Sequence, residues 1–134
     1  MIDFENQIYT KVVTALRETF PNIHTESITI YSPEKFPCVC IEEADNYASQ
    51  DTMDNGTSEN HANVMYEVTV YSNKVSTAKS ECKKIFSIID SVFDELNFYR
   101  TVRTVVRTND AHICRMVGRY NGTIDKNGII YRRS

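Results

Sequence analysis

Residues 76–96, STAKSECKKIFSIIDSVFDEL, give the clearest structural signal in the chain. Their apolar side chains recur every three or four residues, which is the spacing of one face of an α-helix. Ser76 stands where a helix cap is expected, and the lysines fall largely outside the apolar face. A helix with one apolar face must pack against another element, so the segment predicts a helix lying on a sheet. Its apolar face consists of Ala78, Cys82, Ile85, Ile89, Val92 and Leu96, widened by Phe86 and Phe93.

A second amphipathic helix is predicted near the beginning of the chain. Asp3 is placed to cap it. Pro21 ends it, because proline disfavours helical geometry in the residue before it. Its apolar side chains recur every fourth residue. These apolar side chains are Phe4, Ile8, Val12, Leu16 and Phe20. The core is expected to combine them with Cys82, Ile85, Ile89 and Val92 of the other helix.

Alternating apolar and polar side chains predict the strands. In the third of them, Val64, Tyr66, Val68 and Val70 share one face, and this strand is expected to pair back on the second. Asn121-Gly122 predicts a turn or a bulge, and residues 125–128 a hairpin turn. The predicted strands span residues 26–31, 38–42, 63–72, 98–108, 112–120 and 129–133.

The resulting fold class is α+β, with two helices packed on one face of a mainly antiparallel sheet. The order is helix, three strands, helix, and then two or three strands. The 134 residues suit a single domain spanning 1–134, because two domains would each lack core. The apolar fraction of 41% and the charged fraction of 25% are typical of a soluble globular protein. No apolar run approaches the roughly 18 residues of a membrane-spanning helix.

The residue types that usually carry catalysis or bind metals do not form a known motif. The N-terminus lacks the basic and apolar blocks of a signal peptide, so a cytosolic chain with reduced cysteines is expected. Cys38, Cys40, Cys82 and Cys114 lack the paired spacing of a zinc site and are interpreted as buried free thiols. His24, His61 and His112 have no nearby nucleophile or carboxylate at a catalytic spacing. We therefore expect no enzyme activity and no cofactor.

Residues 45–62 are polar, acidic and aperiodic, and they predict a long mobile loop. No lysine or arginine occurs between Glu42 and Glu59. The carboxylates lack the regular spacing of a calcium-binding loop, so a metal site is not expected. They are Glu42, Glu43, Asp45, Asp51, Asp54 and Glu59.

The net charge of −3 conceals an asymmetry along the chain. Residues 1–96 contain 16 acidic and 7 basic side chains, whereas residues 97–134 contain 2 acidic and 8 basic ones. On the predicted strands Arg103 and Arg107 share a face, Arg100 has the opposite parity, and Arg115 and Arg119 share a face. Together with tyrosines, such residues suit single-stranded nucleic acid, a solvated sheet face or a protein interface. The acidic remainder favours an interface formed by Arg100, Arg103, Arg107, Arg115, Arg119, Arg132 and Arg133.

The layout of the whole chain resembles the tail terminator, or tail completion, proteins of long-tailed bacteriophages. The resemblance rests on the order of elements, on FPCV at 36–39 before a strand, and on the long polar loop. It rests also on the ending, RYNGTID at 119–125 and IYRR at 130–133. It covers nearly the full chain through diffuse local patterns, because no short invariant motif marks this family.

The resemblance implies a structural virion protein, made in the host cytoplasm and located at the junction of tail and neck. Members of the family cap the completed tail tube as a hexameric ring and present a surface to the head and neck connector protein. DNA later passes through the channel without specific binding. The loop containing Asp45, Asp51, Asp54 and Glu59 would then face the tube or the channel. Another neck component, and less so a small nucleic-acid-binding domain using the basic C-terminal sheet, are the alternatives.

Overall fold

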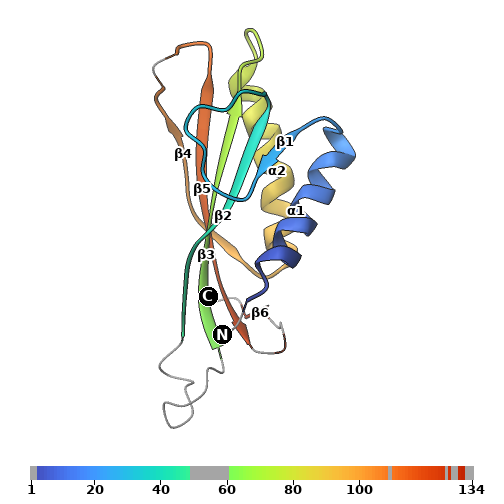
Figure 1. Cartoon of the computed structure of the whole chain (residues 1–134), viewed down its shortest axis with the longest axis vertical. Coiled ribbons are helices and arrows are strands. Elements are labelled where there is room, and N and C mark those ends of the chain that lie inside the picture. The colour runs from blue at the N-terminus through green and yellow to red at the C-terminus, as the bar shows by residue number, and fades with distance from the viewer. Residues whose placement is uncertain (1–2, 49–60, 109, 126, 128–129, 132–134) are drawn as a thin grey trace.

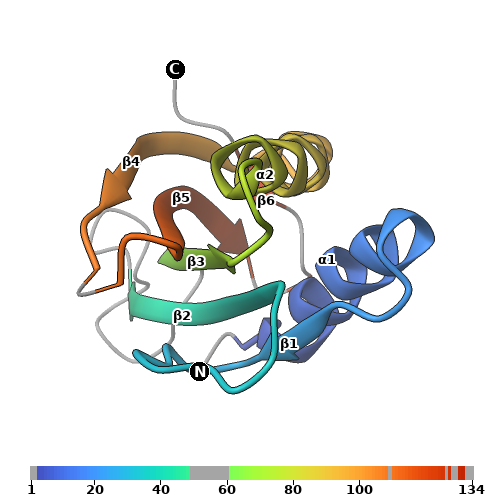
Figure 2. The same cartoon turned by 90° about the horizontal axis from the view of Figure 1, so that it is seen from above.

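The computed structural model describes residues 3–48, 61–108, 110–125, 127 and 130–131. Two helices and six strands follow one another in the predicted α+β order (Figure 1). Both helices lie on the same side of one strongly twisted sheet (Figure 2). The elements are α1 (Glu5–Thr19), β1 (His24–Glu26), β2 (Cys38–Ala48), β3 (His61–Ser72), α2 (Ala78–Glu95), β4 (Tyr99–Val106), β5 (Cys114–Asp125) and β6 (Ile130–Tyr131).

The sheet is mainly antiparallel, as predicted. Its strand order is β1-β2-β3-β5-β4, and β6 pairs with β5. Only β1 and β2 run parallel, and β3 pairs back on β2 as expected. Because β3 occupies one edge of β5 along its full length, β4 and β6 must share the other edge of β5. The long antiparallel hairpin of β2 and β3 extends beyond the ends of both helices (Figure 1).

The core lies between the helices and the sheet, and it uses the predicted apolar faces. Val64, Tyr66, Val68 and Val70 of β3 are buried there, and Phe93 of α2 stacks on Tyr120 of β5 with ring centroids 4.3 Å apart. Three residues expected in the core are only half-buried at its margin, namely Phe4, Phe20 and Val92. The helical residues buried in the core are Ile8, Val12, Val13, Leu16, Cys82, Ile85, Phe86, Ile89 and Phe93.

Two glycines of β5 make room for aromatic rings. A Cβ atom at Gly118 would lie 2.7 Å from the ring of Phe86, and one at Gly122 would lie 2.7 Å from the ring of Phe98. The predicted turn or bulge at Asn121-Gly122 is therefore wrong. Gly122 is a regular strand residue opposite Val64, and β5 continues to Asp125. Here glycine serves close packing rather than a turn.

The strand predicted at residues 26–31 is also wrong, because β1 ends at Glu26. The chain instead leaves the edge of the sheet and covers part of the face without helices. There Ile30 and Phe36 pack against Cys38, Cys40 and Tyr71. The Tyr71 hydroxyl donates a hydrogen bond of 2.7 Å to the Ile30 carbonyl oxygen. Of the two alternating isoleucines only Ile30 packs on this small second core, whereas Ile28 is 59% exposed, so the alternating pattern does not reflect pairing in the sheet.

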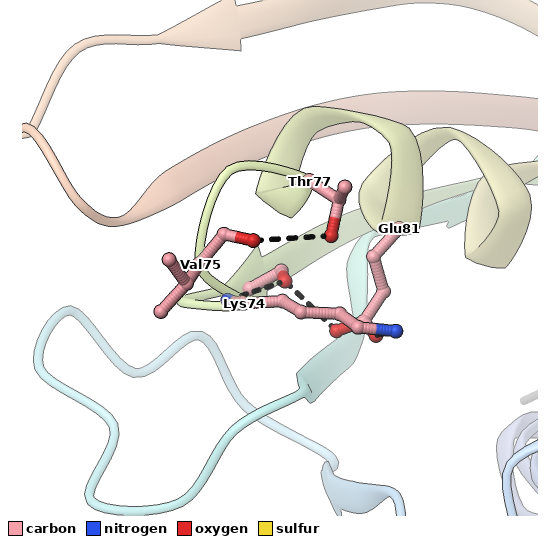
Figure 3. A network of polar contacts seen from close by, with 5 residues as sticks. Lys74, Val75, Thr77 and Glu81 are labelled. Carbon is pink, nitrogen blue, oxygen red and sulfur yellow. Dashed lines mark hydrogen bonds and ion pairs between the residues drawn. The ribbon is translucent and has the colours of Figure 1, made fainter.

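The connection from β3 to α2 is fixed by polar contacts (Figure 3). The buried Ser72 hydroxyl donates to Glu81 Oε1 at 2.8 Å and accepts from the backbone N–H of Lys74 at 3.3 Å. The Lys74 ammonium lies 3.9 Å from Glu81 Oε2. The prediction that Ser76 caps the helix is wrong, because the N-cap residue of α2 is Thr77. Ser76 lies one residue earlier, with a positive φ of 64°.

The predicted loop at 45–62 is shorter at both ends. Residues 45–48 belong to β2 and residues 61–62 to β3, where Asn46 pairs with Val64 and Ala48 with Ala62. Residues 49–60 lie outside the described residues, so the prediction that the loop is mobile concerns a segment that the structure does not describe. Polar side chains are compatible with these strand ends because the hairpin arm projects past the helices (Figure 1).

Candidate functional site

The arginines of β4 lie at an outer edge of the sheet. Arg100 is opposite Tyr120, and Arg103 is opposite Gly118. Directly opposed residues on paired strands point to the same face of the sheet. Tyr120 and Gly118 both lie on the face that packs against α2, next to Phe93 and Phe86 respectively. Arg100 and Arg103 therefore share a face, and the prediction that they have opposite parity is wrong. The reason is a bulge between Arg100 and Val102, which inserts one extra residue into β4.

Arg100 belongs to a small polar cluster between β4, α2 and β5. Its guanidinium lies 2.6 Å from Asp90 Oδ2, and the Tyr120 hydroxyl donates a hydrogen bond to the other oxygen of Asp90. Burial, and then the hydrogen bond to Asp90, raise the pKa of Tyr120 above its ordinary value. Arg100 is thus engaged within the subunit, which leaves less of its charge available to a partner.

Arg115 and Arg119 share the opposite, helix-free face, as predicted. Arg119 Nε lies 3.2 Å from Glu67 Oε2 across the strand pair. The Arg115 guanidinium lies over Tyr31 and Tyr71, at 5.2 and 5.7 Å from the ring centroids. Both side chains have partners within the subunit, so the seven predicted arginines do not form one basic face. Arg132 and Arg133 lie outside the described residues.

Arg103 and Arg107 are the exposed cations of this edge. Among the described residues neither has an ion-pair partner. Val102 and Val105 beside them are 43% and 48% exposed. The outer edge of β4 therefore combines free positive charge, exposed apolar surface and backbone groups that no described strand pairs with.

The opposite side of the molecule is acidic. Glu43 of β2 accepts a hydrogen bond of 3.3 Å from the Tyr66 hydroxyl. Burial first, and then the charges of Glu5 and Asp3, raise the pKa of the Glu43 carboxyl. Asp45 is exposed on the same strand, whereas Asp51, Asp54 and Glu59 lie outside the described residues. Sequence reasoning missed Asp3 and Glu5, because only the packing of α1 on the sheet brings them near Glu43.

An open groove of about 810 Å³ lies between the β3–α2 connection and the end of the β4–β5 hairpin. Lys74, Lys79 and Arg107 line it together with His112, and Val75 beside them is 88% exposed. Within the described ranges no three histidine, cysteine or acidic side chains come close enough to hold a metal ion. The groove therefore offers positive charge and some apolar surface, without the grouping that metal chemistry requires.

The four cysteines are buried or half-buried, and two of them differ in acidity: the hydrogen bond between the thiols of Cys38 and Cys40 raises the pKa of Cys38 and lowers the pKa of Cys40 to about 7. Cys38 and Cys40 share a face of β2, opposite Tyr71 and Thr69, and both are buried. The Cys82 thiol donates to the Val70 carbonyl oxygen at 3.7 Å, and burial raises its pKa. A raised pKa keeps a thiol protonated and unreactive. His24 contacts Glu26 at 3.0 Å on the surface.

Neither the models of known protein families nor the curated proteins give a match to this chain. In the part of the chain that the structure describes, no helix has the length and apolarity needed to cross a membrane.

Proposed function

We propose that this protein is a structural subunit that assembles into a ring, caps the completed tail tube of a bacteriophage and joins it to the neck. Its partners are further copies of itself, the tail tube protein and a head–neck connector protein, and DNA passes through the ring. The ring is proposed to contain six subunits, as the family resemblance implies. No catalytic residue or cofactor is part of this proposal.

The observation that carries the proposal is the opposite charge of the two flanks of the sheet. Asp3, Glu5 and Glu43 lie close together on one flank, and Arg103 and Arg107 lie on the other. A contact between two different patches of identical subunits is heterologous, and it closes into a ring when the rotation between neighbours permits. Two copies meeting through the same patch would instead bring like charges together.

The alternative of a small nucleic-acid-binding domain receives less support. Its basis was a single basic face on the C-terminal strands, but Arg100 and Arg103 face the helices, whereas Arg115 and Arg119 face away from them. Arg119 and Arg100 are also neutralised by Glu67 and Asp90. A continuous basic track for a nucleic-acid backbone is therefore interrupted among the described residues. Another head–tail connector subunit remains the nearer alternative.

The test is electron microscopy of tail tubes assembled from the tube protein encoded in the same genome. We expect the added protein to form a ring of density at one tube end and to stop elongation from that end. Arg103→Glu combined with Arg107→Glu should leave the tubes uncapped. Arg17→Glu combined with Lys84→Glu, two exposed positions on α1 and α2, serves as the charge reversal of the same size. Tubes that elongate unchanged and carry no terminal density would contradict the proposal.

A further inference from the structure

The sheet has two sides on which a strand has no described strand beside it over part or all of its length. β4 pairs only with β5, so its outer edge is open from Tyr99 to Val106. On the opposite side β1 covers the edge of β2 only at Cys38, Val39 and Cys40. Thr29 contacts the side chain of Glu42 at 3.0 Å. Beyond Cys40 no described strand pairs with this side of β2, whose register with β3 is irregular between Glu43 and Asp45. An open edge offers hydrogen bonds to another strand.

The directions of the strands fit an edge-to-edge contact between copies. β2, β3, β5 and β4 alternate in direction, so β2 and β4 are antiparallel to one another. If β4 of one subunit lies beside β2 of the next, with the helices of both on the same side, the new pair is also antiparallel. The alternation then continues across the boundary, and no strand has to reverse.

The side chains of the two edges are also complementary. Glu43 lies opposite Tyr66, and therefore on the helix side of the sheet. Arg103 lies on the helix side as well, and Arg107 lines the groove beside the beginning of α2. In a sheet that continues from one subunit to the next, Glu43 of one subunit and Arg103 of its neighbour would lie on the same, helix-covered face. Glu43, Asp3 and Glu5 lack a cationic partner among the described residues, and Arg103 and Arg107 lack an anionic one.

We propose that subunits join by adding the outer edge of β4 to the open edge of β2 in the next subunit, with Arg103 or Arg107 placed against Glu43. This inference rests on the self-assembly in the proposed function and names the surfaces that carry it. Backbone hydrogen bonds and the exposed Val102 and Val105 supply contact, and the charges set direction and register. Because each subunit offers one edge of each kind, every subunit in a closed ring has both edges covered.

Disulfide trapping tests the contact. One batch carries Glu43→Cys and a second, differing in mass by a tag, carries Arg103→Cys or Arg107→Cys. After mixing and mild oxidation we expect a covalent heterodimer with at least one of the two arginine positions. Each variant alone should give no covalent dimer beyond the wild type, which controls for the native thiols. In the matched control, the Glu43→Cys batch is mixed with a batch that carries Lys84→Cys, an exposed position on α2, and no covalent heterodimer is expected.

A chain carrying both cysteines should form a covalent ladder that ends at the size of the ring. Native mass spectrometry of the uncrosslinked wild type separates the two possible failures. If the wild type assembles but position 43 cross-links to neither 103 nor 107, the edge contact is wrong and the proposed function survives. If Arg103→Cys cross-links to itself, a symmetric contact replaces the proposed one. A wild type that never assembles overturns both.

Discussion

Gly118 and Gly122 show how single residues shape this sheet. Each stands where a Cβ atom would lie 2.7 Å from an aromatic ring, of Phe86 or Phe98 respectively. Gly118→Ala should therefore lower the free energy of unfolding by about 1–3 kcal/mol, the cost of overpacking a close-packed core. Urea denaturation measures it. In a Phe86→Leu background the same substitution should cost less, since the clashing ring is absent. Equal costs in both backgrounds would show that the ring is not the cause.

Glu43 makes stability depend on pH in a direction opposite to that of most carboxylates. Its folded pKa is raised, first by burial and then by Glu5 and Asp3. The folded state therefore binds more protons than the unfolded state, and stability falls as pH rises from about 4.3 through the raised value. Glu43→Gln should flatten this fall in urea denaturation of the monomer between pH 4 and 8. Glu5→Gln should flatten it less. A slope unchanged by Glu43→Gln would refute this account.

At the scale of elements, the sequence predicted the helices and central strands because their side-chain periodicity follows one core. Val12 and Leu16 of α1, and Val68 and Val70 of β3, are all fully buried. Prediction failed where a contact distant in sequence decides the conformation. The bulge in β4 depends on how β4 pairs with β5, and Gly122 is a strand residue that pairs with Val64 and leaves room for the ring of Phe98. Neither partner is visible in a local pattern.

The edge strand β4 carries the prediction about assembly. Arg103 and Arg107 are exposed and have no ion-pair partner among the described residues. Arg103→Glu with Arg107→Glu should abolish oligomers, because carboxylates would then face the Glu43 flank. Exposed substitutions of this kind usually change stability by less than about 0.5 kcal/mol, so the monomer should remain folded. Light scattering and circular dichroism measure the two effects. Oligomers that persist in the double variant would show that this edge is only a solvated surface.

At the scale of the whole molecule, the sequence predicted that charge is divided but not where the charges lie. The excess of basic residues after position 97 is countable, yet strand register decides which of them reach a partner. Arg100, Arg115 and Arg119 find partners within the subunit, at Asp90, at two tyrosine rings and at Glu67. These pairings join segments far apart in the chain, so composition alone could not reveal them.

Opposite flanks also predict a salt dependence for the whole assembly. Ions screen exposed charges over a Debye length of about 10 Å at 0.1 M salt and about 3 Å at 1 M. The apparent dissociation constant of the oligomer should therefore rise with salt concentration in sedimentation experiments. Lys84→Glu should not change that dependence, since Lys84 is exposed and lies on the side of α2 that faces away from its buried residues. An assembly strengthened by salt would indicate that apolar contacts alone hold it.

Whether this chain closes into a ring through two different surfaces is measured by native mass spectrometry of the untagged protein over a concentration series. We expect one dominant oligomer with a fixed number of subunits, six by the resemblance, in equilibrium with monomer. Since each subunit of a closed ring has both edges covered, larger species should be absent. A monomer at every concentration, or a ladder of sizes without a preferred number, would contradict this expectation.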